Sequence, residues 1–358
     1  MKETINETIK DTMRTLVVNK DGSLEIRSVP VPPITPKQAL VKTISCGICN
    51  GTDAKLIHRK FKGVGPEQYP LMLGHEAVGE VVKLGSEVKG YHLGDRVLLP
   101  FVDPDPVLYP GLGSAWGGYS EYAVVHDAAA YEEGQAPECA CAQTVLPPDV
   151  DPVDAAMIVT LREVLSSIRR FGITKGSSVA VFGCGPVGQT FIRFMSLLGV
   201  HPLIAFDRHE EKLAQARLGG ADYAFNNLET DPVQKIREIC PDGVQYVVDA
   251  IGLTSLINLA MECICDQGKI CVYGISQECS MQIDWEKAPY NWQLQFQQFP
   301  GKAEEGQAHE QVMRWIRDGV IDLKDYISVY FRFDDIAEAF EKLENREIRK
   351  KGIIVWDR

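Results

Sequence analysis

Short apolar runs separated by glycine and proline make up the first third of the chain. Residues 38–44 and 121–125 are typical, and similar runs cover 15–18, 77–82 and 96–99. Runs of this length with Gly and Pro between them are typical of strands in an all-β region. The pattern therefore predicts a barrel-like β domain after a polar N-terminal extension that spans residues 1 to about 20.

From Asp151 onward, segments with helical periodicity alternate with apolar segments of strand length. The helical segments are 155–170, 187–198 and 210–218, and the apolar ones are 178–182, 203–206, 244–248 and 269–273. Such alternation indicates a parallel, doubly wound sheet. After Tyr290 the pattern is irregular, until two further helices, 309–318 and 335–343, lead to a terminal strand over 352–356.

Composition and charge narrow the class of protein. A chain of 358 residues, 45% apolar and 24% charged, is typical of a globular protein with two domains. Its net charge of −12 argues against nucleic acid, because phosphate binding needs a basic surface. No run approaches the roughly 18 apolar residues of a membrane span, and the N-terminus is too polar for a signal peptide. We therefore expect a cytoplasmic protein with no membrane partner.

A glycine-rich turn follows the first predicted strand of the second region and opens a helix. Gly183, Gly185 and Gly188 give the spacing G-x-G-x-x-G, with Pro186 and Val187 inside it. The first glycine permits a tight turn, the second lets a pyrophosphate approach the backbone, and the third allows close helix packing. The helix N-terminus adds the positive end of its dipole. This context predicts a dinucleotide site, although a turn in another doubly wound fold would share the spacing.

Asp207 ends the next predicted strand and indicates which nicotinamide cofactor to expect. Its carboxylate would accept hydrogen bonds from the adenosine ribose hydroxyls and would repel the 2′-phosphate of NADP. The neighbouring Arg208 could instead serve that phosphate. We expect NAD as the cofactor, with NADP as the alternative.

Cys46 and Cys49 form a C-x-x-C pair, and His75 and Glu76 follow later in the chain. Ten cysteines are too few here for a disulfide scaffold, so thiols or metal ligands are expected. A redox pair normally opens a helix in a thioredoxin-like unit, and a structural zinc site needs a second cysteine pair; neither context is present. A thiolate and an imidazole can hold Zn²⁺ and leave a position free for chemistry. Beside a nicotinamide, such a metal suggests alcohol oxidation.

An ordered set of motifs resembles the zinc-dependent medium-chain dehydrogenases, most closely their sorbitol and polyol branch. The resemblance covers nearly the whole chain beyond the N-terminal extension, and its motifs are 47–53, 74–76, 94–97, 118–122 and the glycine-rich turn. It implies an α/β fold with two domains: a GroES-like, β-rich catalytic domain, residues 1–154 and 295–358, and a Rossmann NAD-binding domain, residues 155–294. It also implies a homodimer or homotetramer built through the Rossmann domains.

The resemblance implies one catalytic zinc, held by Cys49, His75 and one or two carboxylates. Glu76 is either a ligand or a close neighbour of the ligands. A further carboxylate is expected on the helix that enters the Rossmann domain, where residues 160–166 are similar to the Leu-x-Glu-Pro-Leu-Ser run of the polyol branch and offer Glu163. The alternative for Glu163 is a solvated helical glutamate paired with a nearby arginine.

Thr52 is the expected relay for the substrate proton, and Asp53 beside it is expected to orient His75 or an arginine. In the family, one residue usually separates the zinc cysteine from this hydroxyl. Here both Asn50 and Gly51 intervene. The reach of Thr52 toward the metal is therefore the first feature to inspect.

Two further stretches differ from many relatives. Residues 98–118 contain no cysteine, so we expect no structural zinc lobe. An acidic insertion over 131–143 carries Cys139 and Cys141. Two neighbouring thiols without a histidine or a further cysteine pair are expected to be unpaired loop cysteines rather than a metal clamp.

Aromatic and amide side chains suggest the substrate class. Trp116 and Tyr119 fall in the region that lines the family's pocket, and residues 290–293 combine aromatics with amides. Such groups suit the CH faces and hydroxyls of a polyol, cyclitol or sugar, although residues 290–293 would equally suit a subunit interface. The expected reaction transfers hydride from a secondary hydroxyl to NAD and gives a ketone. The alternatives are a dehydrogenase of simple secondary alcohols or amino-alcohols, a zinc-free quinone or enoyl reductase, and a non-catalytic NAD-binding protein.

Overall fold

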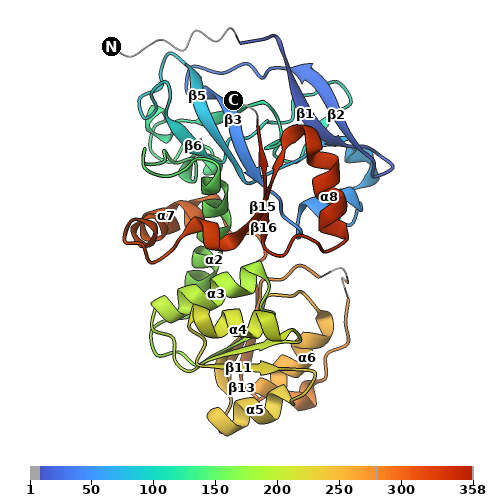
Figure 1. Cartoon of the computed structure of the whole chain (residues 1–358), viewed down its shortest axis with the longest axis vertical. Helices are drawn as coiled ribbons and strands as arrows, with labels where there is room; N and C mark the ends of the chain where they lie inside the picture. The colour runs from blue at the N-terminus through green and yellow to red at the C-terminus, as the bar shows by residue number, and fades with distance from the viewer. Residues whose placement is uncertain (1–8, 277, 279, 357–358) are drawn as a thin grey trace. The chain divides into compact units, whose positions relative to one another are not determined.

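The chain divides into two compact units in a computed structural model that describes residues 9–276, 278 and 280–356. The first unit combines residues up to Thr160 with those from Gly301 onward, and the second runs from Leu161 to Pro300. The expected boundaries were 154/155 and 294/295, and the observed ones lie six residues later. Helix α2 (Met157–Phe171) therefore begins in the first unit and continues in the second. Figure 1 shows the order of the elements. Within the described residues, no helix is both long and apolar enough to cross a bilayer.

The first unit contains two β-sheets. The smaller sheet has the order β2-β1-β4-β7 and consists of β1 (Thr12–Val18), β2 (Leu24–Pro30), β4 (Leu71–Met72) and β7 (Gly113–Ser114). The larger has the path β15-β16-β3-β5-β6, and β8 also pairs with β3. Its strands are β3 (Gln38–Gly47), β5 (Ala77–Leu84), β6 (Arg96–Leu98), β8 (Tyr122–His126), β15 (Ile327–Arg332) and β16 (Lys351–Val355). The predicted β-rich domain is thus present, with β15 and β16 contributed by the C-terminal segment.

Strand β3 is the centre of the larger sheet. It pairs with β5 along most of its length, with β8 near its start and with β16 near its end. Every side chain of β3 except Lys42 is buried, which explains its nearly continuous apolar sequence. The end of β3 leads into the short helix α1 (Asp53–Ile57).

A hydrophobic cluster fixes α1 and the C-terminal helix α8 (Ile336–Glu344) in the first unit. Leu56 of α1, Phe340 of α8 and Tyr119 belong to this cluster. The rings of Tyr119 and Phe340 meet edge to face, with centroids 5.9 Å apart. The first unit also contains helix α7 (Lys302–Arg317). It begins before the predicted residue 309, and its first turns are polar, so the apolar periodicity does not reveal them.

The second unit is a parallel sheet with the strand order β11-β10-β9-β12-β13-β14. Numbered within the unit, this is the order 3-2-1-4-5-6 of a doubly wound dinucleotide-binding fold. The strands are β9 (Val179–Phe182), β10 (Leu203–Asp207), β11 (Tyr223–Asn226), β12 (Val244–Asp249), β13 (Ile264–Val272) and β14 (Trp292–Phe296). The predicted α/β fold class is confirmed.

Among the described residues, four α-helices connect the strands from β9 to β13. They are α3 (Pro186–Leu197), α4 (Glu210–Gly219), α5 (Pro232–Ile239) and α6 (Thr254–Cys263). Ile236 of α5 and Met261 of α6 share one hydrophobic cluster with Phe182 and Phe206, whose rings stack 4.8 Å apart. Successive residues of a strand point to opposite faces of the sheet. The residues of β9 and β10 that alternate with Phe182 and Phe206 therefore lie on the face away from this cluster.

Candidate metal centre and dinucleotide site

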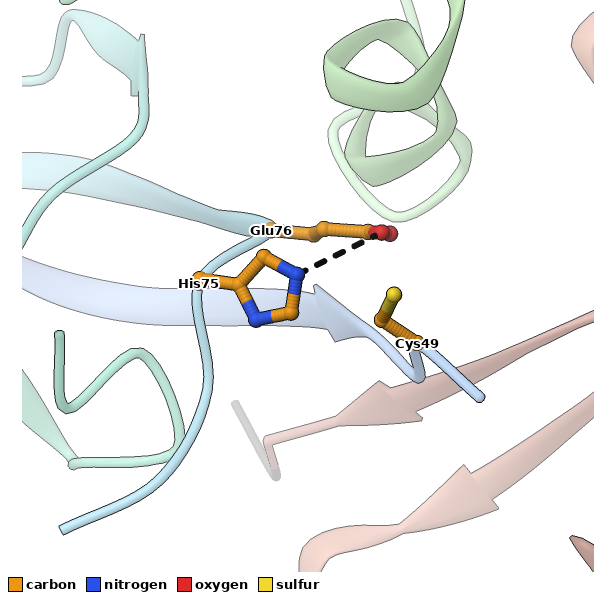
Figure 2. A group of neighbouring side chains, drawn as sticks. All are labelled: Cys49, His75 and Glu76. Carbon is orange, nitrogen blue, oxygen red and sulfur yellow. Dashed lines mark ion pairs between the residues drawn. The ribbon is translucent and has the colours of Figure 1, made fainter. Parts of the chain in front are cut away.

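The end of β3 and the turn before β5 bring the candidate metal ligands together. Cys46 on β3 pairs with Ala77 on β5, and the Gly47 N–H donates to the Glu76 carbonyl at 3.0 Å. Cys49 follows β3, and His75 precedes Glu76 in the turn. One ligand atom from each of Cys49, His75 and Glu76 lies within 4.8 Å of the others. Figure 2 shows the three side chains pointing toward one another.

Two glycines leave the room that this arrangement needs. A Cβ at Gly47 would lie 2.2 Å from Glu76 Oε2, so a larger residue would displace the carboxylate. Gly74 has a φ of +101°, and a Cβ there would lie 2.5 Å from the Tyr119 backbone nitrogen. Both positions therefore favour glycine for a local physical reason.

His75 has its two ring nitrogens in different surroundings. Its Nδ1 lies 3.4 Å from Oδ1 of the fully buried Asp53. Among the described residues, neither of these two atoms makes a hydrogen bond. Nε2 lies 3.9 Å from Glu76 Oε1, inside the ligand group. A metal-bound imidazole needs this division, with a carboxylate at one nitrogen and the ion at the other.

The charges around His75 favour a bound cation. Burial by itself would lower the pKa of His75, but the Asp53 carboxylate and the Cys49 thiol beside it raise that pKa well above its usual value. The group thus attracts positive charge, which a metal would supply in place of a proton. A thiolate, an imidazole and a carboxylate are a donor set that suits Zn²⁺. The residues therefore fit the expected metal.

Glu76 is held by two residues that the sequence did not single out. Lys351 Nζ on β16 lies 2.8 Å from Oε1 and 2.7 Å from Oε2, and the Thr160 hydroxyl donates to Oε1 at 3.3 Å. Lys351 and Glu76 are 8% and 1% exposed, so this is a buried ion pair. With Zn²⁺ bound, the ion and Lys351 would balance the negative charges of Cys49, Asp53 and Glu76.

Cys46 lies outside the ligand group. It is fully buried, and its thiol donates weakly to the Gly47 carbonyl at 3.7 Å. Burial, followed by the charge of Asp53, raises its pKa well above the usual value. A buried thiol that resists ionisation is a poor nucleophile and a poor ligand. Cys46 is thus part of the core rather than half of a redox or metal pair.

Tyr119 does not have the position expected of a substrate-lining residue. Its side chain is fully buried, and its hydroxyl donates to Asp53 Oδ2 at 2.8 Å and to the Gly47 carbonyl at 3.0 Å. Its contact with the α8 side of the core leaves no surface for a substrate. The polar end of Tyr119 is directed at a carboxylate inside the protein, so the structure gives no support to its predicted place in the substrate pocket.

The remaining predicted site residues lie in three places. Trp116 has a φ of +68°, is half-buried, and has its ring centroid 5.4 Å from that of His75. Thr52 precedes α1 and is 2% exposed, after the turn formed by Asn50 and Gly51. Glu163 is half-buried on α2 in the second unit. The group of described residues that could share an ion, Cys49, His75 and Glu76, belongs to the first unit.

The predicted dinucleotide turn has the geometry that its glycines suggested. Gly183 has a φ of +95°, and a Cβ at Gly188 would lie 1.8 Å from the Gly183 carbonyl oxygen. Gly185 has no neighbouring atom within 4 Å of its Cβ position, and Pro186 begins α3 directly after it. Val187 is half-buried in the first turn. The open space at Gly185 is what a pyrophosphate at a helix N-terminus requires.

Asp207 lies at the carboxyl end of β10, next to this turn. Its Oδ2 accepts a hydrogen bond from the Cys184 N–H at 2.8 Å, and its Oδ1 accepts one from the His209 N–H at 3.0 Å. The carboxylate is thereby anchored with both oxygens in defined directions, and Asp207 is 8% exposed. Arg208 is exposed, and its Nε contacts His209 Nε2 at 3.2 Å.

The insertion over 131–143 contains a short 3₁₀ helix, Glu138–Cys141, which packs against α7. Both Cys139 and Cys141 are free thiols. Burial and the charge of Asp103 raise the pKa of Cys139 to about 11. Neither cysteine belongs to a group of described residues that could hold a metal.

Comparison with known proteins covers both units. Residues 35–134 match the family model of the alcohol dehydrogenase GroES-like domain, and residues 186–313 match that of the zinc-binding dehydrogenases. An alcohol dehydrogenase of Geobacillus stearothermophilus is 31% identical over 63% of this chain and 67% of its own length. The sorbitol dehydrogenase of Bacillus subtilis is 22% identical over 94% of this chain and 95% of its own.

A solved structure supports the same fold. An alcohol dehydrogenase from Escherichia coli CFT073, complexed with NADH, has a TM-score of 0.76 and 23% sequence identity. The match covers 97% of this chain and 100% of the other. The GroES-like domain and the zinc-binding dehydrogenase domain are therefore matched in this order along one chain. The chain belongs to the zinc-dependent medium-chain dehydrogenase family and is an oxidoreductase.

Proposed function

We propose that this protein is a zinc-dependent, NAD-linked dehydrogenase that oxidises a secondary hydroxyl of a polyol, cyclitol or sugar to a ketone. The observation that supports the metal is the group of Cys49, His75 and Glu76, in which His75 and Glu76 are buried and Cys49 is half-buried, with Asp53 beside the imidazole. Resemblance to the polyol branch, and the sorbitol dehydrogenase among the relatives, support the substrate class.

Each residue of the centre has a separate task in this mechanism. Cys49 and His75 would hold the ion, and Asp53 would fix the ring of His75 by accepting from Nδ1. When bound, Zn²⁺ supplies a Lewis acid that lowers the pKa of a substrate hydroxyl. The Thr52 hydroxyl would relay the released proton, since a hydroxyl is a relay and not a strong base. Trp116, beside His75, would offer its ring face to the CH groups of the substrate.

We propose Glu163 as the further carboxylate ligand, on the resemblance of its helix to the polyol branch. Glu76 is the other candidate, and its ion pair with Lys351 already occupies both of its oxygens. A metal would have to compete with Lys351 for Glu76. This competition favours a supporting role for Glu76 and supports the choice of Glu163.

The dinucleotide turn would bind the cofactor through the second unit. Gly183, Gly185 and Gly188 would bring the backbone to the pyrophosphate, and the N-terminus of α3 would face its charge. The anchored carboxylate of Asp207 supports NAD over NADP, because a 2′-phosphate would meet a negative charge there. Exposed Arg208 is the group that would allow NADP. A homodimer or homotetramer stays part of the proposal.

The test is a screen of NAD(P)H formation over polyols, cyclitols, sugars, simple secondary alcohols and amino-alcohols, with and without a chelator. We expect turnover of a polyhydroxylated substrate with NAD, slower turnover with NADP, and loss of activity after chelation that added zinc restores. A preference for simple alcohols would refute the proposed substrate class but would leave the proposed zinc-dependent oxidation of a hydroxyl unchanged. Activity indifferent to chelation would refute the zinc proposal, and tight NAD binding without any turnover would favour a non-catalytic protein.

A further inference from the structure

Tyr119 carries a buried hydroxyl that the mechanism above does not use. The tyrosine is fully buried, and its hydroxyl lies between two acceptors, Asp53 Oδ2 at 2.8 Å and the Gly47 carbonyl at 3.0 Å. Burial and the charge of Asp53 raise the pKa of Tyr119 well above its usual value, so the hydroxyl keeps its proton. Because an ionised carboxylate is the stronger acceptor, that proton is directed mainly at Asp53.

Asp53 connects this hydroxyl to two candidate ligands. Its Oδ2 accepts from the Cys49 N–H at 3.0 Å as well as from Tyr119, and its Oδ1 faces His75 Nδ1 at 3.4 Å. Both donors therefore act on one oxygen, which fixes the plane of the carboxylate and leaves the other oxygen for His75. A fully buried carboxylate depends on such donors, since without them its desolvation is not compensated.

The backbone of Tyr119 holds the hydroxyl at a defined place. Its N–H donates to the Leu73 carbonyl at 2.9 Å, and its carbonyl accepts from Leu16 at 3.2 Å. Phe340 packs against the ring from the core side. The side chain therefore reaches Asp53 Oδ2 from a rigid base, while the other oxygen of Asp53 faces His75.

We propose that Tyr119 is a positioning residue of the metal centre, which orients His75 and the Cys49 turn through Asp53. This inference rests on the proposed zinc site. It predicts that removal of one hydroxyl, without change to the ring, weakens zinc binding. A tyrosine that only filled the core would lose a hydrogen bond on the same substitution and would leave zinc affinity unchanged.

Tyr91 provides a matched control in the same unit. It is 6% exposed, and its hydroxyl donates to the carbonyls of His126 and Gln143 at 3.1 and 2.8 Å. It does not belong to the hydrophobic cluster that contains Tyr119. Tyr91→Phe therefore removes a comparable buried hydroxyl from a place with no link to Asp53.

The experiment measures zinc affinity by competition with a chelating indicator for the wild type, Tyr119→Phe and Tyr91→Phe, together with melting of each metal-free protein. Loss of a group that supports a metal ligand typically costs about 10 to 100-fold in metal affinity. We expect a loss of that order for Tyr119→Phe and none for Tyr91→Phe, with similar changes in metal-free melting temperature. Wild-type zinc affinity in Tyr119→Phe, or an equal loss in Tyr91→Phe, would overturn the inference alone.

A double substitution covers the case in which Tyr119→Phe is poorly folded. If Tyr119 acts through Asp53, adding Tyr119→Phe to Asp53→Asn should change zinc affinity little beyond the effect of Asp53→Asn alone. Fully additive losses would contradict the proposed route. Absence of stoichiometric zinc from the wild type would instead refute the proposed function, and this inference with it, so the two failures can be told apart.

Discussion

Lys351 and Glu76 form a buried ion pair beside the candidate metal ligands. Both are buried, and burying two charges is worthwhile only if their geometry is good and other hydrogen bonds complete it. Here the ammonium contacts both carboxylate oxygens, and Thr160 adds a further hydrogen bond. A buried pair of this kind contributes little net stability, but removal of one partner leaves an uncompensated charge.

Replacing Lys351 by Met should therefore destabilise the metal-free protein by about 3 to 5 kcal/mol in denaturant unfolding. Zinc should restore part of this loss, because the ion offers the freed Glu76 carboxylate another positive charge. Lys342→Met is the control: Lys342 pairs with Glu338 on the surface of α8, and its loss should change unfolding little. Equal losses with and without zinc would show that Glu76 does not turn toward the metal.

The sequence could not identify this pair. Lys351 lies 275 positions from Glu76 in the chain, within a basic C-terminal run that looks like a solvated surface. By contrast, Cys49, His75 and the glycine-rich turn were predictable because each is a local motif with a fixed spacing. The direction of the Tyr119 side chain is not predictable in this way, since a local motif does not show which way a side chain points.

At the scale of elements, burial on both faces made the central strands predictable. The segments 178–182 and 203–206 are continuous apolar runs, as expected for strands covered by helices on two sides. The edge strand β14 has no such continuous run: Trp292, Leu294 and Phe296 alternate with glutamines and are only partly buried or exposed. The sequence pattern does not predict helices α5 and α6 either.

The turn after β12 shows how one element can carry a pH dependence. Asp249 is 2% exposed, and its Oδ1 accepts from the N–H groups of Ile251 and Gly252, each at 2.8 Å. Burial raises its pKa above the usual value in spite of these hydrogen bonds. When the pKa of a carboxyl is higher in the folded state, the protonated group stabilises the folded protein. This stability is fully present below the unfolded pKa, about 3.9, and is lost as pH rises through the folded pKa.

Asp249→Asn should keep the accepting oxygen and remove the ionisation. The variant should therefore gain stability relative to the wild type as pH rises above about 4, with a plateau above the folded pKa, in urea unfolding at several pH values. Asp21→Asn should show the opposite trend, because hydrogen bonds from Ser23 lower the pKa of Asp21. A pH-independent difference for Asp249→Asn would contradict the assigned cause.

At the scale of the whole molecule, the two kinds of site belong to different units. The metal group of Cys49, His75 and Glu76 lies in the first unit, and the glycine-rich turn with Asp207 lies in the second. Each unit has its own hydrophobic clusters, so loss of the metal should leave the core of the second unit unchanged. Metal binding and cofactor binding should therefore be separable by mutation.

Replacing Cys49 by Ser should abolish stoichiometric zinc and turnover while NADH binding, measured by fluorescence titration, stays within a few-fold of the wild type. The reason is that a serine hydroxyl does not ionise at neutral pH, so the site loses its anionic soft ligand. Cys46→Ala is the matched control, because Cys46 is a core residue outside the ligand group and its loss should leave zinc bound. Full zinc content and normal turnover in Cys49→Ser would refute the metal centre. Loss of NADH binding together with zinc would mean that the two units depend on each other for their folding.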